Sequence, residues 1–117
     1  MQSYSPVSYL DLGIAEKGIR EFKSTHDNIT YYFTSESQKS AFEKNPKKYV
    51  PQFGGFCAYG VYAGALFRPD PGKFIIKDGK YYLFLSNLEV DARDLWLKGD
   101  HAELLAKASS NWSGMTQ

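Results

Sequence analysis

The sequence is poor in cysteine, in net charge and in long apolar runs. Only one of its 117 residues is cysteine, which excludes an internal disulfide framework, a CxxC redox pair and an all-thiolate zinc site within one chain. The 14 basic and 13 acidic side chains give a formal net charge of +1, so electrostatics favours neither a nucleic-acid nor an anionic-membrane partner. No apolar run reaches the roughly 20 residues of a membrane-spanning helix. We therefore predict no nucleic-acid partner and no membrane span.

Aromatic residues, in contrast, are abundant. They make up 16% of the chain, within an apolar content of 43%, which is typical of a folded globular protein. A chain of this length buries about two-thirds of the surface that it exposes when unfolded, enough for one core. We expect a single compact domain over residues 1–117.

The patterns along the chain predict two hairpins and several short helices. Residues 20–33 form the first hairpin around His26-Asp27-Asn28, and residues 74–85 form the second around Asp78-Gly79, a type I′ signal. Both hairpins continue through paired tyrosines to a residue that can cap a helix, so we expect them to share one small antiparallel sheet. The fold class is α+β. Helices are predicted over residues 35–45, 57–64, 87–99 and 100–109.

The single cysteine, Cys57, lies in the stretch QFGGFCAYG, residues 52–60. Two interpretations are open. A free cysteine often packs as a small buried apolar residue, and the aromatic neighbours Phe53, Phe56 and Tyr59 fit that role. Alternatively, a turn at Gly54-Gly55 followed by a helix start would expose the thiol to unpaired backbone N–H groups, which favour thiolate. Thiolate is both a nucleophile and a ligand for soft metals such as copper(I).

Catalytic motifs are absent from the sequence. It contains no nucleophile elbow, P-loop, HExxH or dinucleotide-binding fingerprint. We therefore predict that the chain is not an enzyme. Two function classes remain: a binding module for a metal ion or small ligand centred on Cys57, and a structural or protein-interaction domain in which Cys57 is a core residue. Thiol exchange or redox chemistry at Cys57 is a more distant alternative.

Residues 28–61, NITYYFTSESQKSAFEKNPKKYVPQFGGFCAYGV, resemble the YHS domain in its small stand-alone branch. The specific features are the aromatic strand TYYF, the capped helix that follows it, and the block PQFGGFCAY. The upstream SPVSYLD resembles the branch's D-P-V-A-Y segment, with Ser5 where Asp is usual, and DGKYYLFLS also fits. The resemblance covers nearly the whole chain.

The metal-binding relatives carry cysteines in D-P-V-C and F-C-x-x-x-C, and here those positions are Ser8, Thr34 and Gln38. Hydroxyl and amide groups replace thiolate poorly toward a soft or borderline metal, so we expect no zinc site. The resemblance instead points to the cysteine of GGFC, here Cys57. His26, where relatives read H-x-G, is its predicted second ligand, and copper is the metal to test. A solvent-exposed turn residue is the alternative for His26, and a surface position is expected for His101.

Localisation follows from two alternatives for the N-terminus. MQSYSPVSYL has neither a basic n-region nor an apolar h-region. As a native start it indicates a cytoplasmic protein. As a mature start with its signal removed it fits the stand-alone branch, whose members are often exported bacterial proteins, and the resemblance then implies the periplasm or cell envelope.

Overall fold

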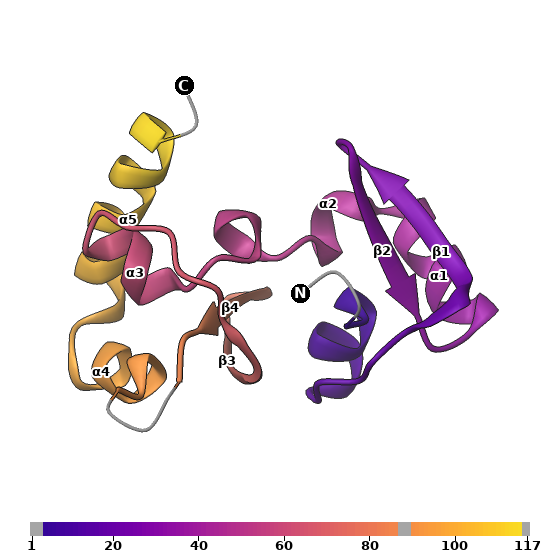
Figure 1. The fold of residues 1–117 in the computed structure, drawn as a ribbon, viewed down its shortest axis with the longest axis horizontal. Helices are drawn as coiled ribbons and strands as arrows, with labels where there is room; N and C mark the ends of the chain where they lie inside the picture. Colours follow the sequence, from indigo (N-terminus) through magenta and orange to yellow (C-terminus); the bar gives the residue numbers. More distant parts are fainter. Residues whose placement is uncertain (1–3, 87–89, 116–117) are drawn as a thin grey trace. The chain divides into compact units, whose positions relative to one another are not determined.

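The structure is a computed structural model that describes residues 4–86 and 90–115. Each of the two hairpins is followed by helices, most of them shorter than three turns (Figure 1). In order, the elements are η1 (Ser8–Leu12, a π-helical turn), β1 (Ile19–His26), β2 (Ile29–Phe33), α1 (Glu36–Lys44), α2 (Pro46–Tyr49), η2 (Gln52–Gly55, a 3₁₀ turn), α3 (Ala58–Tyr62), β3 (Asp70–Lys77), β4 (Lys80–Phe84), α4 (Ala92–Lys98) and α5 (His101–Met115).

The predicted α+β class and both predicted hairpins are confirmed. The expectation of one shared sheet is corrected, because the strands of the described residues form two separate two-stranded sheets, β1-β2 and β3-β4. Turn signals determine the pairing inside a hairpin but not the pairing between hairpins. In addition, a register shift between Ile19 and Lys23 interrupts the ladder of β1, and such a bulge disrupts regular pairing.

The turns of the two hairpins use the residues that the sequence indicated. Asp27 and Asn28 have φ of 50° and 67°, and Asp78 and Gly79 have φ of 54° and 75°. A type I′ turn requires positive φ at both central residues. Asp, Asn and Gly adopt this conformation at lower cost than other residues, so the local sequence alone specifies both turns.

Two compact units can be distinguished by the contacts within the chain. The first comprises Met1–Pro51 and Ile76–Tyr81, and the second comprises Gln52–Ile75 and Tyr82–Gln117. The second hairpin thus contributes its turn to the first unit and its remaining residues to the second. Each unit is described by itself below, and the single domain over residues 1–117 stays a prediction.

The first unit is built on the β1-β2 hairpin. Helix α1 packs against both strands (Figure 1), and its Phe42 ring lies 5.1 Å from the rings of Tyr31 and Phe33. Helix α1 begins where the sequence predicts, since the Ser35 hydroxyl accepts a hydrogen bond from the Gln38 N–H at 3.2 Å. The buried core of this unit is Val7, Tyr31, Phe33, Phe42 and Tyr49.

The second unit is mainly helical. Helix α3 packs against α5 and α4, around Trp96, whose ring lies 5.6 Å from that of Phe84. The Asn111 amide donates to the Val61 and Tyr62 carbonyls at 2.9 and 3.0 Å, which satisfies carbonyls at the end of α3.

The last two helices differ in length from their predictions. The helix predicted from residue 100 begins as expected but continues to Met115. The helix predicted from residue 87 begins at Ala92, after its N-cap Asp91, and the predicted start at Asn87 lies outside the described residues. The Asp94 N–H, together with Lys73, holds the pKa of the Asp91 carboxyl below its ordinary value, which favours the charged cap.

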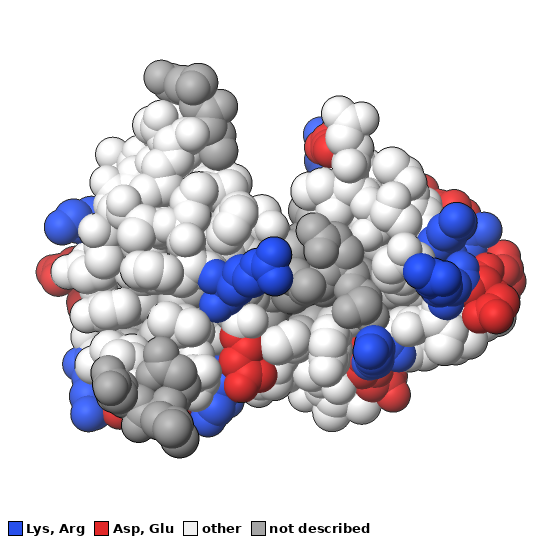
Figure 2. Space-filling model, in the orientation of Figure 1, with Lys and Arg blue, Asp and Glu red and all other residues white. Residues whose placement is uncertain are grey.

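The surface carries charges of both signs. On the face drawn in Figure 2, basic and acidic side chains lie near one another and broad areas between them are uncharged. In the part of the chain that the structure describes, no helix combines the length and apolar character needed to cross a bilayer.

Candidate functional site

The candidate site begins with a left-handed turn in front of Cys57. Phe53, Gly54 and Gly55 have φ of 55°, 61° and 85°. Gly54 suits this turn because its φ is positive, and a Cβ there would lie 3.1 Å from the Trp112 ring, which would have to shift by a few tenths of an ångström. Phe53 adopts the left-handed conformation at a cost of about 1–2 kcal/mol. Its ring is buried against the rings of Tyr82 and Trp112, at 6.2 and 6.1 Å, and this packing offsets the strain.

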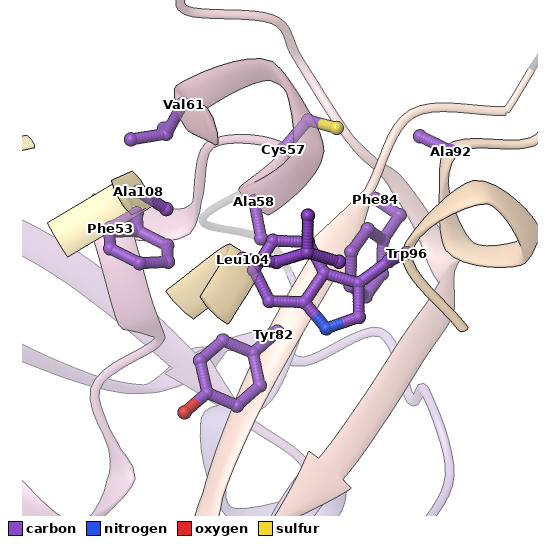
Figure 3. Packing of buried hydrophobic residues seen from close by; sticks show 10 residues of the cluster. All are labelled: Phe53, Cys57, Ala58, Val61, Tyr82, Phe84, Ala92, Trp96, Leu104 and Ala108. Carbon is purple, nitrogen blue, oxygen red and sulfur yellow. The ribbon is translucent and has the colours of Figure 1, made fainter. Parts of the chain in front are cut away.

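Cys57 is the N-cap of helix α3. Its sulfur accepts a hydrogen bond from the Gly60 N–H at 3.4 Å, and its own N–H donates to the Phe67 carbonyl at 2.9 Å. The predicted Gly-Gly turn and the helix start are therefore confirmed. The side chain is 1% exposed, as expected from the interpretation of Cys57 as a buried core residue. Figure 3 shows its sulfur directed toward the side of the cluster on which Ala92 lies.

A pocket of about 330 Å³ opens beside this sulfur within the second unit. Its space arises from small residues, since Cys57, Gly60, Ala63 and Ala92 leave room that larger side chains would fill. Larger residues complete the lining: Tyr59, Phe67, Leu85, Val90 and Leu95. None of these described lining residues is charged, and the lining surface is apolar. The site can therefore hold apolar matter next to a thiol.

The rim of the pocket is unusually exposed for apolar residues. Phe67 is 46% exposed, Leu95 39% and Val90 38%. Single exposed apolar residues are common, but several around one concavity are typical of a binding surface. Sequence patterns do not indicate this pocket, because its lining comes from four separate segments of the chain.

His26, the predicted second ligand, belongs to the first unit, whereas Cys57 belongs to the second. The His26 side chain is 25% exposed. Its Nε2 lies 3.3 Å from an Asp27 carboxylate oxygen and its ring lies edge-on to Phe42, with centroids 6.2 Å apart. Its pairing with Cys57 stays a prediction. Across residues 4–86 and 90–115 no three His, Cys, Asp or Glu side chains gather as metal ligands do.

His101 was expected at the surface, and the structure places it there only in part, since the residue is half-buried. Its Nδ1 accepts a hydrogen bond from the Trp96 indole N–H at 3.0 Å, and its ring lies 5.4 Å from that of Tyr82. Its Nε2 is enclosed and has no hydrogen-bond partner among the described residues. An accepting Nδ1 requires the neutral ring to carry its proton on Nε2. The sequence identified the helix cap at Asp100 but not the hydrogen bond from the Trp96 indole to His101.

Ser8, Thr34 and Gln38, which the predicted resemblance sets opposite cysteines, meet in the first unit. The Gln38 amide oxygen accepts from the Ser5 hydroxyl at 2.7 Å and from the Thr34 N–H at 3.0 Å. The amide nitrogen donates to the Ser8 hydroxyl at 3.0 Å, which donates to a Glu16 carboxylate oxygen at 2.7 Å. Ser5 and Ser8 are fully buried. We call this group the Gln38 cluster; its polar atoms bind one another.

Comparison of the chain with protein-family models, with curated proteins and with solved structures gave no match. The candidate site is therefore argued from its own geometry.

Proposed function

We propose that the chain is a small, non-enzymatic binding module and that the apolar pocket beside Cys57 is its binding site. One observation supports the proposal above all. The pocket, at about 330 Å³, lies at the lower end of the 300–1,000 Å³ typical of small-molecule sites, and its exposed rim is apolar. The structural or protein-interaction role, with Cys57 as a core residue, is the alternative that an experiment must exclude.

The lining of the pocket favours binding over catalysis. A cysteine hydrolase needs a base within hydrogen-bond reach of the thiol and a group that orients this base. The described lining residues include no histidine and no carboxylate, and the Cys57 sulfur accepts from a backbone N–H. Cys57 is the only cysteine of the sequence, so the chain contains no second thiol to form a redox pair with it.

Copper(I) is the second candidate ligand. The Gly60 N–H donates to the Cys57 sulfur, and an apolar wall would keep water from a reduced metal. His26, or a group from a second chain, would complete the coordination. Zinc is not expected, because the hydroxyl and amide groups of the Gln38 cluster are poor zinc ligands.

Membership of the YHS domain family is part of this proposal. The resemblance placed Ser8, Thr34 and Gln38 at the positions of one metal site, and the Gln38 cluster joins atoms of all three. Residues far apart in the sequence meet as that alignment requires, which supports it. The periplasm or cell envelope is then the proposed location.

Thiol labelling of the native protein tests the binding site. Methyl methanethiosulfonate is uncharged, and its 2-sulfonatoethyl analogue has the same reactive group with a negative charge. We expect the uncharged reagent to label native Cys57 at least tenfold faster, relative to the ratio in denaturant, because the apolar pocket admits it alone. The Cys57→Ser variant is the blank. Labelling by the uncharged reagent only at the rate of global unfolding would reject the proposal and favour the core cysteine.

Copper(I) is tested separately. Reduced protein is titrated against a competing chelator, with Cys57→Ser and His26→Ala in parallel. Wild-type protein that binds no better than Cys57→Ser rules out copper. If Cys57→Ser abolishes binding and His26→Ala does not, the thiol is a ligand and His26 is not its partner.

A further inference from the structure

If the pocket is the binding site proposed above, its lining restricts the chemistry of the ligand. No described lining residue can form an ion pair, and the lining surface is apolar. A charged or strongly polar group placed there would lose its hydration without gaining a partner, at considerable cost. Cys57 also lines the pocket, but its sulfur already accepts the Gly60 N–H. The lining therefore selects an uncharged ligand.

The volume of the pocket restricts the ligand's size. At about 30 Å³ for each water-sized group, a space of about 330 Å³ holds about ten non-hydrogen atoms. The exposed rim residues Phe67, Val90 and Leu95 would be covered by such a ligand, which removes apolar surface from water. A ligand of this size fills the pocket and meets its rim.

Gly60 lies between Cys57 and Phe67, two residues that line the pocket. A Cβ on Gly60 would lie 2.7 Å from the Phe67 ring, and the Gly60 N–H is the group bound by the Cys57 sulfur. The absence of a side chain at position 60 therefore lets Phe67 close over this end of the pocket. We propose that the pocket binds a small, uncharged, apolar molecule of about ten non-hydrogen atoms, recognised by shape and not by a polar head group.

Naphthalene and naphthalene-2-sulfonate test this proposal, because they share one ring system and differ in charge. Binding is followed through amide chemical shifts of the labelled protein, with the Gly60, Ala63 and Ala92 amides as the expected reporters. We expect naphthalene to bind with a Kd at least tenfold lower than that of the sulfonate. Equal affinity for both, or larger shifts at amides outside the pocket, would overturn the proposal.

A pair of alanine variants provides the matched control. Ala63 lines the pocket and is exposed, whereas Ala106 is exposed on α5 and is not among the lining residues. We expect Ala63→Leu to fill the mouth and weaken naphthalene binding at least tenfold, and Ala106→Leu to change it less than twofold. Equal effects of the two substitutions would overturn the assignment of the site.

A rim variant keeps the test valid if Ala63→Leu folds poorly. Leu95→Lys places a cation on an exposed rim position, so it should weaken naphthalene binding and strengthen that of the sulfonate. An unchanged charge preference contradicts the proposal.

Three outcomes separate this inference from the proposed function. If native Cys57 reacts with the uncharged reagent but naphthalene does not bind, the ligand class is wrong and the binding module stands. If neither occurs, both fail. An affinity for naphthalene that falls as the protein concentration rises would assign the pocket to a second copy of the chain and overturn the small-molecule ligand.

Discussion

The Gln38 cluster of the first unit and the apolar pocket of the second differ in polarity and in packing: the cluster is polar and hydrogen-bonded, whereas the pocket is apolar and open. In the cluster, the hydroxyls of the buried Ser5 and Ser8 and groups of half-buried residues form hydrogen bonds of 2.7–3.0 Å, which hold the side chains in place. In the pocket, small residues leave about 330 Å³ unfilled beside a thiol. Satisfied polar groups stabilise a fold, whereas open apolar space is available to a ligand. The difference directs the search for function to the second unit, although the resemblance placed the relatives' metal site in the first.

Substitution of Gln38 by Leu should have the largest effect on stability. It leaves the buried Ser5 hydroxyl and the half-buried Thr34 N–H without their acceptor and the buried Ser8 hydroxyl without a donor, and an unsatisfied buried polar group costs about 1–3 kcal/mol. We expect the free energy of unfolding to fall by about 4 kcal/mol in urea titrations. Ser37→Leu, at an exposed position of the same helix, should change it by less than about 0.5 kcal/mol. Similar effects of the two variants would show that the cluster contributes little.

Two glycines give the next comparison. A Cβ at Gly18 would lie 2.4 Å from the Tyr32 backbone carbonyl carbon, whereas the nearest atom to a Cβ at Gly60 would belong to the exposed Phe67 ring, at 2.7 Å, with the Ala65 carbonyl oxygen next at 3.3 Å. Backbone cannot move aside as a side chain can, so Gly18→Ala should cost about 3 kcal/mol. Gly60→Ala should be nearly neutral, because Phe67 can turn away and alanine gains about 1 kcal/mol in helix propensity.

The decisive measurement for Gly60→Ala is thermal unfolding together with native labelling of Cys57. A turned Phe67 ring changes the pocket, so the labelling rate should change while Tm stays nearly constant. A fall in Tm equal to that of Gly18→Ala would mean that the second unit is packed as rigidly as the first.

The sequence predicted the local features of the fold. Both hairpin turns depend on Asp, Asn and Gly at positive φ, and the cap at Ser35 depends on its own hydroxyl. The turn before Cys57 follows from Gly54 and Gly55 in the same way. In each case the residues that determine the conformation are neighbours in the chain.

Features that depend on distant contacts could not be predicted in this way. The separation of the two sheets depends on which strand edges meet, and the position of His101 depends on the Trp96 indole that donates to it. The pocket depends on Gly60 and Ala92 being small at positions that the fold brings together. The Gln38 cluster is an intermediate case, since the predicted resemblance named Ser8, Thr34 and Gln38 together but not the hydrogen bonds that join them.

Cys57→Ala comes next in size of effect. Loss of the sulfur removes buried volume and the cap on the Gly60 N–H, so we expect a loss of about 1–2 kcal/mol in the free energy of unfolding. Because the removed atom lies on the pocket wall, naphthalene affinity should fall less than threefold. A complete loss of naphthalene binding by a folded Cys57→Ala protein would show that the ligand depends on sulfur, in favour of a soft metal or a thiol-reactive ligand.

The smallest effect is expected at alkaline pH and concerns a second polar contact of the first unit. Burial, followed by the nearby Tyr31 and Tyr9 hydroxyls, raises the pKa of Tyr81 well above its ordinary value, and the Tyr81 hydroxyl donates to the Tyr49 carbonyl at 2.7 Å. A group whose pKa is raised by folding contributes stability that is complete below its unfolded pKa of about 10 and is lost as the pH rises beyond it. The ionised phenol would also lack the proton that it donates.

Wild-type protein should therefore lose stability above about pH 10, as measured by urea midpoints between about pH 8 and 11. Tyr81→Phe should cost about 1 kcal/mol at neutral pH through the lost hydrogen bond and should show a shallower alkaline decline. Tyr62→Phe, in the second unit, should follow wild type. Parallel declines of wild type and Tyr81→Phe would assign the alkaline loss to other groups, such as Tyr31 and Tyr49, whose pKa values burial also raises. In that case, ionisation of the Tyr81 hydroxyl would not be the cause of the loss of stability at alkaline pH.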